Sequence, residues 1–395
     1  MNRFLEEAMD IKDEIIANRR HIHRRPELGF DLPETIEFVA TQLESYGYEP
    51  KKLGGGLTCI AGTGEAPVIM LRADMDALPQ QEDSGEEFSS EIDGVCHSCG
   101  HDCHTAMLLG AAKILKRHES ELQGTVKFMF QPAEEMLKGS ERMIEEGILE
   151  NPKVDAAMGF HINTGPCGAH DTHPGHFSLA REKMMPSADE FRITVTGKAA
   201  HGSTAFAGVS AVHIASNIVN ALQQMPILET AYNDNVVLAI GSMESGNAAN
   251  IIPETAVIRG NMRAYTPEKR EFMKKRIVEL SEGIAKAWRG EADVAFPFGV
   301  APNVNDRELT LEMEEYLEDV AQVEIIQPIA GSEDFANLCQ YVPTFFANVG
   351  CGSPQDGYEY SMHNPKMRID EAGLPYGTAA NCQCAYEYLA HHSNK

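Results

Sequence analysis

The residues of this sequence that can bind a metal ion gather where short apolar runs end. One run, 68–71, leads into Asp74-Met75-Asp76, and a second, 126–130, leads into Gln131-Pro132-Ala133-Glu134-Glu135. A third, 154–160, leads into His161. In an open α/β sheet, groups just past the carboxyl ends of the strands converge on one crevice. The simplest interpretation is a single metal site in which Glu134 or Glu135 remains to move protons.

The densest group of potential ligands lies between the first two runs, in Cys96-His97-Ser98-Cys99-Gly100-His101-Asp102-Cys103-His104. Catalytic zinc-type sites leave a coordination position open, whereas structural zinc sites are closed, often by two Cys-x-x-Cys pairs. Cys96 and Cys99 form one such pair, but Cys382-x-Cys384 has the wrong spacing for a second. The pattern therefore favours a catalytic site over a structural zinc site, a redox pair, or core cysteines beside hydrogen-bonded histidines.

Glu134 and Glu135 are adjacent carboxylates at the end of a predicted buried strand. Neighbouring side chains there cannot point the same way, so one can bind metal while the other faces the substrate as general base. The competing interpretation is a solvated pair at the start of a helix over 134–146, where acidic residues favour the helix N-terminus. The buried run and Pro132, which fixes the turn, favour a functional pair.

Other candidates carry weaker signals. His201 follows an exposed strand, and a surface histidine is the alternative. Asn250 and Arg263 flank the two sides of a predicted hairpin and could present polar groups together, although Arg263 could equally form a surface salt bridge. His363 lies in the loop Met362-His363-Asn364-Pro365, where a lone histidine is usually unremarkable.

Three histidines also recur at a spacing of three, at positions 170, 173 and 176. The neighbouring Pro174 and Gly175 favour a flexible loop over a second metal site.

The composition excludes several classes of protein. A formal charge of -26 argues against nucleic acid or an anionic membrane as partner, because both need a basic surface. No apolar run approaches the roughly 20 residues that span a bilayer. The N-terminal residues show helical spacing rather than the apolar core of a signal peptide, so the nine cysteines are expected in a reducing, cytoplasmic setting.

The first 185 or so residues alternate helical and strand patterns. Helices are predicted over 2–24, from Pro33 to the Tyr46-Gly47 turn, and over 104–116. Such βαβ alternation predicts an α/β fold with a mostly parallel sheet covered by helices.

The pattern changes near Ser187, and 395 residues suit two domains better than one. The predicted order is a strand, a helix ended by Pro226, two strands, a long helix and a further possible strand, over 190–196, 209–225, 236–240, 255–264, 268–288 and 294–296 respectively. This order suits a ferredoxin-like α+β domain of the split βαβ type. A helix over 309–320 and strands over 323–326 and 344–349 should then return to the first sheet. We therefore expect a catalytic domain, 1–186 and 301–395, interrupted by an inserted domain, 187–300.

Taken together, these residues resemble the M20 metallopeptidase family, in the amidohydrolase branch that includes hippurate hydrolase and the plant auxin-conjugate hydrolases. The resemblance runs nearly end to end. Its motifs are His23-Arg24-Arg25-Pro26-Glu27-Leu28, Asp74-Met75-Asp76-Ala77-Leu78-Pro79, Cys99-Gly100-His101-Asp102-x-His104, Gln131-Pro132-Ala133-Glu134-Glu135, His161, Asn250-Ile251-Ile252-Pro253-Glu254, Arg263, Gly331-Ser332-Glu333-Asp334-Phe335 and His363-Asn364-Pro365.

The resemblance implies a site for two divalent metal ions, Zn²⁺ or Mn²⁺, with Co²⁺ or Ni²⁺ as substitutes in vitro. The implied ligands are Cys99, His101, Glu135, His161 and His363. Asp76 would hold a ligand in place, and Glu134 would be the general base. The inserted domain would be a lid that also forms a homodimer interface. His201, Asn250 and Arg263 would be its substrate-side residues, with His201 able to act across the dimer.

The implied reaction is hydrolysis of the amide bond of N-acyl amino acids or small amino-acid conjugates, as in an aminoacylase. Arg263 could grip a free substrate carboxylate in a two-pronged pair. A dipeptidase or carboxypeptidase, or an inactive relative that binds metal and ligand, is the alternative. In this branch a proline and a second histidine usually follow the lid histidine, but here 203–208 reads Ser-Thr-Ala-Phe-Ala-Gly. This departure should reshape the acyl or side-chain pocket.

Overall fold

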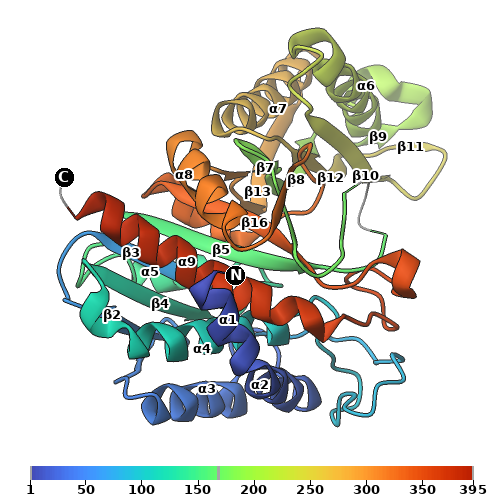
Figure 1. The fold of residues 1–395 in the computed structure, drawn as a ribbon. Helices are drawn as coiled ribbons and strands as arrows, with labels where there is room; N and C mark the ends of the chain where they lie inside the picture. The colour runs from blue at the N-terminus through green and yellow to red at the C-terminus, as the bar shows by residue number, and fades with distance from the viewer. Residues whose placement is uncertain (1, 167–169, 394–395) are drawn as a thin grey trace. The chain divides into compact units, whose positions relative to one another are not determined.

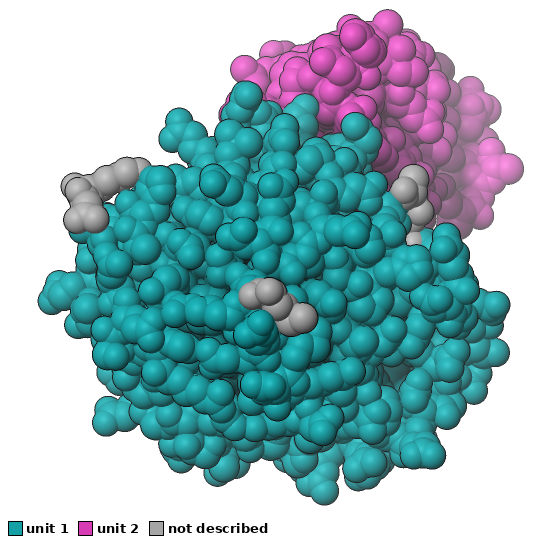
Figure 2. Space-filling view, in the orientation of Figure 1, with its two compact units in different colours: residues 1–184, 304–328, 334–395 teal, residues 185–303, 329–333 magenta. Residues whose placement is uncertain are grey.

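The structure is a computed structural model that describes residues 2–166 and 170–393. The chain divides into two compact units, coloured separately in Figure 2. Unit 1 consists of Met1–Met184, Val304–Pro328 and Asp334–Lys395, and unit 2 of Met185–Asn303 and Ile329–Glu333. The division expected from the sequence, a catalytic domain over 1–186 and 301–395 with an inserted domain over 187–300, stays a prediction.

Unit 1 is built on an eight-stranded sheet with the strand order β1-β2-β4-β3-β5-β16-β6-β15. Figure 1 labels β2, β3, β4, β5 and β16 of this sheet. Neighbouring strands run parallel at β4-β3, β3-β5, β5-β16 and β6-β15. The strands are β1 (Lys51–Leu53), β2 (Gly56–Gly62), β3 (Val68–Asp74), β4 (Thr125–Gln131), β5 (Ala156–Asn163), β6 (His176–Leu179), β15 (Gln322–Ile325) and β16 (Thr344–Gly350). The predicted mostly parallel sheet of an α/β fold is therefore confirmed.

The central strands β3 and β4 are buried at every residue, as expected for apolar runs covered on both faces of a parallel sheet. Helix α4 (His101–Arg117) packs against α2 (Lys12–Arg24), α9 (Leu374–His392) and β3, and most of its residues are buried as a result. Phe128 of β4 and Leu115 of α4 belong to the same hydrophobic core. This core fixes the carboxyl ends of β3 and β4 relative to the N-terminus of α4.

The helices of unit 1 differ from the predictions mainly at their ends. The predicted helix 2–24 is two helices, α1 (Arg3–Asp10) and α2 (Lys12–Arg24), separated at Ile11. Helix α3 (Pro33–Ser45) ends where predicted. The helix predicted from His104 begins at His101, because its first turn holds polar candidate ligands that the apolar periodicity does not reveal. The remaining helices are α5 (Gly139–Glu145), α8 (Arg307–Glu318) and α9 (Leu374–His392).

Unit 2 has a four-stranded antiparallel sheet with the order β10-β12-β8-β13 and two helices, α6 and α7. Its elements are β8 (Ala188–Thr196), α6 (Ala211–Glu229), β10 (Val237–Ser245), β12 (Thr255–Arg263), α7 (Pro267–Ala287) and β13 (Glu291–Val300). Buried and more exposed residues alternate along β8, as predicted, because one face of the strand packs against the helices. The predicted ferredoxin-like α+β order is confirmed.

The prediction that Pro226 ends its helix is wrong, because α6 continues to Glu229. A proline removes one hydrogen bond to the preceding turn. Only the last turn follows Pro226, however, and the buried Leu222 and Met225 anchor the helix on its inner face. Packing therefore outweighs one missing bond. No helix in the described ranges combines the length and the apolar character needed to cross a bilayer.

Candidate active site

Cys99 and His101 are presented by a sharp turn at the start of α4. Gly100, the residue between them, has a left-handed backbone with φ 92°. A Cβ at this position would lie 2.6 Å from Cγ1 of Ile162 on β5. Glycine therefore lets the turn approach β5 closely enough to bring both side chains toward His161.

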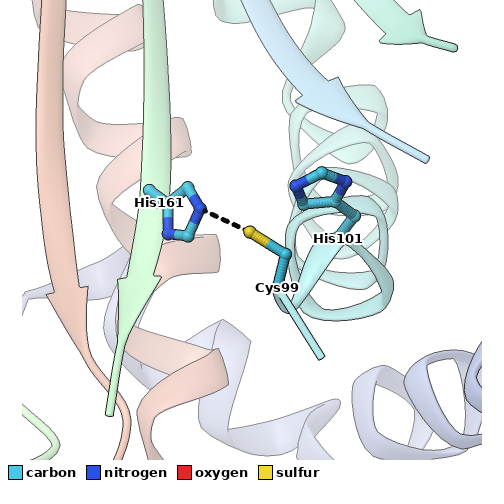
Figure 3. Close-up of side chains that lie close together, drawn as sticks. All are labelled: Cys99, His101 and His161. Carbon is cyan, nitrogen blue, oxygen red and sulfur yellow. Dashed lines mark hydrogen bonds between the residues drawn. The ribbon is translucent and has the colours of Figure 1, made fainter. Parts of the chain in front are cut away.

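Cys99, His101 and His161 form a first group of possible metal ligands. One ligand atom from each lies within 4.8 Å of the others. The Sγ of Cys99 is 3.4 Å from Nε2 of His161 (Figure 3). His161 lies within β5, two residues before its end, rather than beyond the strand as the sequence suggested.

Cys99 also belongs to a second group, with Glu135 and His363, whose ligand atoms satisfy the same limit. Its Sγ is 3.2 Å from Nε2 of His363, and this nitrogen is 3.7 Å from Oε1 of Glu135. The loop that carries His363 is held by a hydrogen bond from its backbone N–H to the carbonyl of Ser98, at 2.6 Å. The five predicted ligands are therefore brought together in unit 1, and the thiol of Cys99 is shared by both groups.

Hydrogen bonds to main-chain carbonyls fix which nitrogen each buried imidazole offers. Nδ1 of His101 lies 2.8 Å from the carbonyl oxygen of Asp76, and Nδ1 of His161 lies 2.6 Å from that of Ile162. A carbonyl can only accept, so Nδ1 of each ring carries a proton, and the neutral form of each ring keeps its lone pair on Nε2. Metal-binding histidines are commonly oriented in this way.

His104 lies beside these ligands, but both of its ring nitrogens are already hydrogen-bonded. Its Nε2 accepts a hydrogen bond from the backbone N–H of Ile162 at 2.9 Å, and its Nδ1 therefore donates to Oδ1 of Asp74 at 2.6 Å. The other oxygen of Asp74 pairs with Arg72 at 2.9 Å. His104 thus supports the site from behind and has no nitrogen left for a metal, whereas Oδ2 of Asp74 lies 3.5 Å from Nε2 of His101.

Asp76 holds the Glu134-Glu135 turn through its side chain. Its two carboxylate oxygens accept the backbone N–H groups of Glu134 at 2.9 Å and of Glu135 at 3.2 Å. Ala133, just before them, has φ 53°, a left-handed conformation that a tight turn requires. Since the carbonyl of Asp76 also fixes His101, this one residue sets the position of three predicted site residues.

The interpretation of Glu134 and Glu135 as a solvated pair opening a helix is wrong. Helix α5 begins only at Gly139, and Glu134 is just 6% exposed. The two carboxylates lie in the turn after β4, where Oε2 of Glu134 is 3.8 Å from Nε2 of His101. Oε1 of Glu134 accepts a hydrogen bond from the backbone N–H of Asp334 at 3.4 Å.

Two buried atoms in this group have no hydrogen-bond partner among the described residues, namely Nε2 of His101 and Oε1 of Glu135. Buried polar atoms are nearly always paired, so orphans of this kind indicate a missing ligand. A thiol, three imidazoles and a carboxylate are donors that suit Zn²⁺ and related divalent ions. The residues therefore fit a metal centre.

Burial dominates the electrostatics of the site. It raises the pKa of the Cys99 thiol well above its usual value, and His101 offsets this only in part. Burial also lowers the pKa of His161, which keeps that imidazole neutral and able to bind metal. For His101 burial acts to lower the pKa, but Asp74 and Cys99 outweigh it and the pKa is raised.

A buried polar network behind the site was not predicted. Asp334 accepts hydrogen bonds from Arg72 at 3.1 Å, from Gln131 at 2.7 Å and from the backbone N–H of Ser140 at 3.0 Å. It thereby joins β3, β4 and α5 near the Glu134 turn. The sequence did hold one signal, because Arg72 is a charged residue that extends a buried apolar run.

The predicted substrate residues lie in unit 2. His201 ends the short strand β9 (Ala200–His201), which pairs with β11 (Ile251–Ile252), and the N–H of Gly202 donates to the carbonyl of Asn250 at 2.7 Å. His201 and Asn250 are therefore neighbours. Arg263 is the last residue of β12, and its guanidinium donates to Oγ of Ser332 at 2.7 Å.

The expectation that Asn250 and Arg263 present polar groups together is wrong within one chain. Asn250 precedes the start of β12 at Thr255, whereas Arg263 is at the other end. Eight residue steps of extended strand span about 26 Å. The sequence signal failed because both flank the same strand but at opposite ends of it.

The histidine-rich segment is a loop up to the start of β6 at His176, and its histidine side chains contact neighbouring polar side chains. His173 lies between Asp171 and Asp356, and His176 is 3.4 Å from Asp171. His170 contacts the side chain of Asn163 at 2.9 Å. His173 and His176 are therefore partners of carboxylates, whereas His170 is not.

Comparison with known proteins finds a matching family and similar sequences and structures. The model of peptidase family M20/M25/M40 matches residues 70–387. IAA-amino acid hydrolase ILR1-like 2 of Arabidopsis thaliana is 38% identical over 397 residues, covering 98% of this chain and 88% of that protein. N-acetyl-L-cysteine deacetylase of Bacillus subtilis is 34% identical over 369 residues, covering 92% and 85%. A solved Bacillus subtilis protein, described as a dinuclear metal binding peptidase from the M20 family, is similar with TM-score 0.81 and 28% identity, covering 97% and 99%.

The shared thiol predicts that metal binding depends on pH. Burial keeps the Cys99 thiol protonated at neutral pH without metal, so binding an ion must release its proton. We expect the apparent affinity to rise by about tenfold per pH unit for each proton released. Competition with a chelator between pH 6 and 8 measures the slope. Cys99→Asp, whose carboxylate needs no such deprotonation, should give a shallower slope. Equal slopes would contradict binding through the thiolate.

Gly139 predicts a steric test of the Glu134-Glu135 turn. A Cβ at Gly139 would lie 1.6 Å from the carbonyl oxygen of Pro132, so Gly139→Ala must displace the turn. We expect a loss of roughly 2–4 kcal/mol in the free energy of unfolding, with weaker metal binding. The control is Gly283→Ala in α7, where nothing lies within 4 Å of a Cβ. It should stabilise the protein by about 0.5–1 kcal/mol. Unchanged stability and metal content in Gly139→Ala would contradict the proposed constraint.

Proposed function

This chain belongs to peptidase family M20/M25/M40, and we propose that it cleaves the amide bond of N-acyl amino acids or small amino-acid conjugates, releasing a free amino acid and a carboxylic acid. It is a metal-dependent hydrolase that acts on amides. The observation that carries the proposal is the shared position of Cys99 in two ligand groups, with Glu134 beside them.

The proposed cofactor is a pair of divalent ions, Zn²⁺ or Mn²⁺. Cys99, His101 and His161 would hold one ion, and Cys99, Glu135 and His363 the other. When bound, such ions lower the pKa of water from 15.7 to about 7 and polarise the substrate carbonyl. Thiolate and imidazole ligands favour Zn²⁺, whereas the carboxylate also suits Mn²⁺.

Glu134 is the proposed general base. It is buried, its backbone is fixed by Asp76, and its carboxylate lies next to the ligand groups. In this role it takes a proton from the attacking water and later passes it to the leaving amine. Asp76 would then be a positioning residue, because it aims both Glu134 and Glu135 without touching the substrate.

Arg263 is proposed to bind the free carboxylate of the amino-acid part of the substrate. A guanidinium can pair with a carboxylate through two parallel hydrogen bonds. Its present partner, the Ser332 hydroxyl, uses one donor of Nη1 and holds the side chain at the end of β12. Substrates would therefore have the form acyl-NH-CHR-COO⁻.

His201 and Asn250 are proposed to act on the substrate held in the other subunit of a homodimer. Support comes from the length of β12, about 26 Å. Asn250 precedes its first residue, Thr255, whereas Arg263 is its last residue. Unit 2 also offers a surface for pairing, because β10 is an edge strand on which Val237 and Met243 are exposed.

The proposed setting is the cytoplasm, where reducing conditions would keep the Cys99 thiol from forming a disulfide. A small-molecule substrate and no nucleic-acid or membrane partner fit the formal charge of -26.

Glu134→Gln should remove the base while leaving the metal ligands in place. We expect kcat to fall by about 10²–10⁴-fold, the usual contribution of general acid–base catalysis, with metal content unchanged by atomic absorption. Glu141→Gln is the control, because Glu141 is an exposed residue of α5 that pairs with Lys138. Should Glu134→Gln hydrolyse every N-acetyl, N-benzoyl and aminoacyl substrate as fast as the wild type, the assignment of the base would be wrong.

Arg263→Ala should act on the substrate carboxylate. We expect KM for free N-acyl amino acids to rise roughly tenfold to hundredfold, from the loss of a charged hydrogen-bonded pair. The matching methyl esters should be little affected. Arg259→Ala is a control on the same strand, since Arg259 forms a surface pair with Glu244. Equal losses on acids and esters would exclude Arg263 from carboxylate recognition.

A further inference from the structure

A second group of metal-type side chains lies in unit 1 where α8 and α9 pack together (Figure 1). It consists of Glu312 of α8 and of His391 and His392, the last two residues of α9. One ligand atom from each lies within 4.8 Å of the others. The group shares no residue with the candidate active site.

Within this group, the imidazole of His392 is hydrogen-bonded and that of His391 is not. Nε2 of His392 lies 2.9 Å from Oε2 of Glu312. The ring of His391 lies 5.0 Å from that of His392, centroid to centroid, and has no hydrogen bond to any described residue. A simple ion pair between His392 and Glu312 gives His391 no role, whereas a metal ion would use all three side chains.

One of the three side chains is held by packing, and a second is carried by an anchored helix. The ring of Tyr388, itself only 5% exposed, stacks on His392 at 4.2 Å and 24°. Glu312 is carried by a helix anchored through the buried Leu309 and Met313. Ligands on rigid elements lose little conformational freedom when they bind an ion. Only the side chain of His391, which is exposed, has to lose conformational freedom when the ion binds.

The surroundings also favour a cation. His391 and His392 lie in the last turn of α9, where the helix dipole is negative and unpaired carbonyls gather. The formal charge of -26 adds an attractive field for cations over the whole chain.

We propose that Glu312, His391 and His392 bind one divalent transition-metal ion, with Zn²⁺ as the best match, separately from the ions of the active site. Two imidazoles and one carboxylate leave a coordination position for water, an arrangement that zinc accepts. Imidazole ligands suit Zn²⁺, Cu²⁺ and Ni²⁺ and are less suited to Mg²⁺ and Ca²⁺. An ion bound here would join the last turn of α9 to α8.

His118 is a partly buried histidine that lies among carboxylates with no second imidazole beside it among the described residues. Its Nε2 lies 2.6 Å from Glu7 and its Nδ1 lies 2.7 Å from Glu121, so both nitrogens are occupied by ion pairs. It offers a single imidazole. His118→Ala is therefore a control for the loss of a histidine that pairs only with carboxylates.

The test is a count of bound Zn²⁺ on the full chain. Protein stripped with a chelator is dialysed against buffered Zn²⁺, and bound metal is measured by atomic absorption. We expect His391→Ala and Glu312→Gln each to bind one ion fewer than the wild type while kcat stays unchanged. His118→Ala should bind as many ions as the wild type. If all variants bind the same number, the proposal is overturned.

A thermal measurement separates this site from the active site. In a Cys99→Ala background, which disrupts the proposed dinuclear centre, added Zn²⁺ should still raise Tm through the α8–α9 site. Adding His391→Ala should abolish that rise without changing Tm in the absence of metal. A rise that survives His391→Ala would place the ion elsewhere and overturn the proposal. This outcome is independent of whether the chain hydrolyses N-acyl amino acids.

Discussion

The structure of the active site depends on one constraint: the single thiol of Cys99 has to reach two groups of ligands at once. His161 comes from β5, His363 from a loop more than 260 residues away in the chain, and both present Nε2 within 3.4 Å of Sγ. Such an approach is possible only because Gly100 adopts a left-handed conformation against Ile162. If the ions bind as proposed, they would stabilise the thiolate of Cys99, whereas burial without metal keeps the thiol protonated.

Much of this arrangement could be predicted because it depends on strand ends. The runs that form β3, β4 and β5 are apolar and short, and parallel strands place the residues at their carboxyl ends along one edge of the sheet. That rule alone brings Asp76, Glu134 and His161 together. It does not reach His363, which lies in a loop with no periodic pattern, so its place came from the family resemblance.

The parts that could not be predicted depend on the direction of single backbone groups. Whether His104 binds metal is decided by the N–H of Ile162, which occupies its Nε2. Whether Glu134 opens a helix is decided by Asp76, whose carboxylate binds two N–H groups and holds the chain in a turn until Gly139. Residue types specify neither outcome, because both require partners brought close by the tertiary fold. Asp334 is a further case, since it fixes the ends of β3 and β4 from a distant part of the sequence.

In unit 2 the expected substrate residues do not lie at one end of the sheet. His201, Asn250 and Arg263 match one family pattern, yet Arg263 is at one end of β12 and Asn250 precedes the other end, and these two ends are about 26 Å apart. A small N-acyl amino acid is much shorter than this distance. If all three residues serve one substrate molecule, a single chain cannot supply them, and the missing end must come from a second chain. Catalysis would then require assembly, because a monomer could hold the carboxylate of the substrate but would lack the donors for its acyl end.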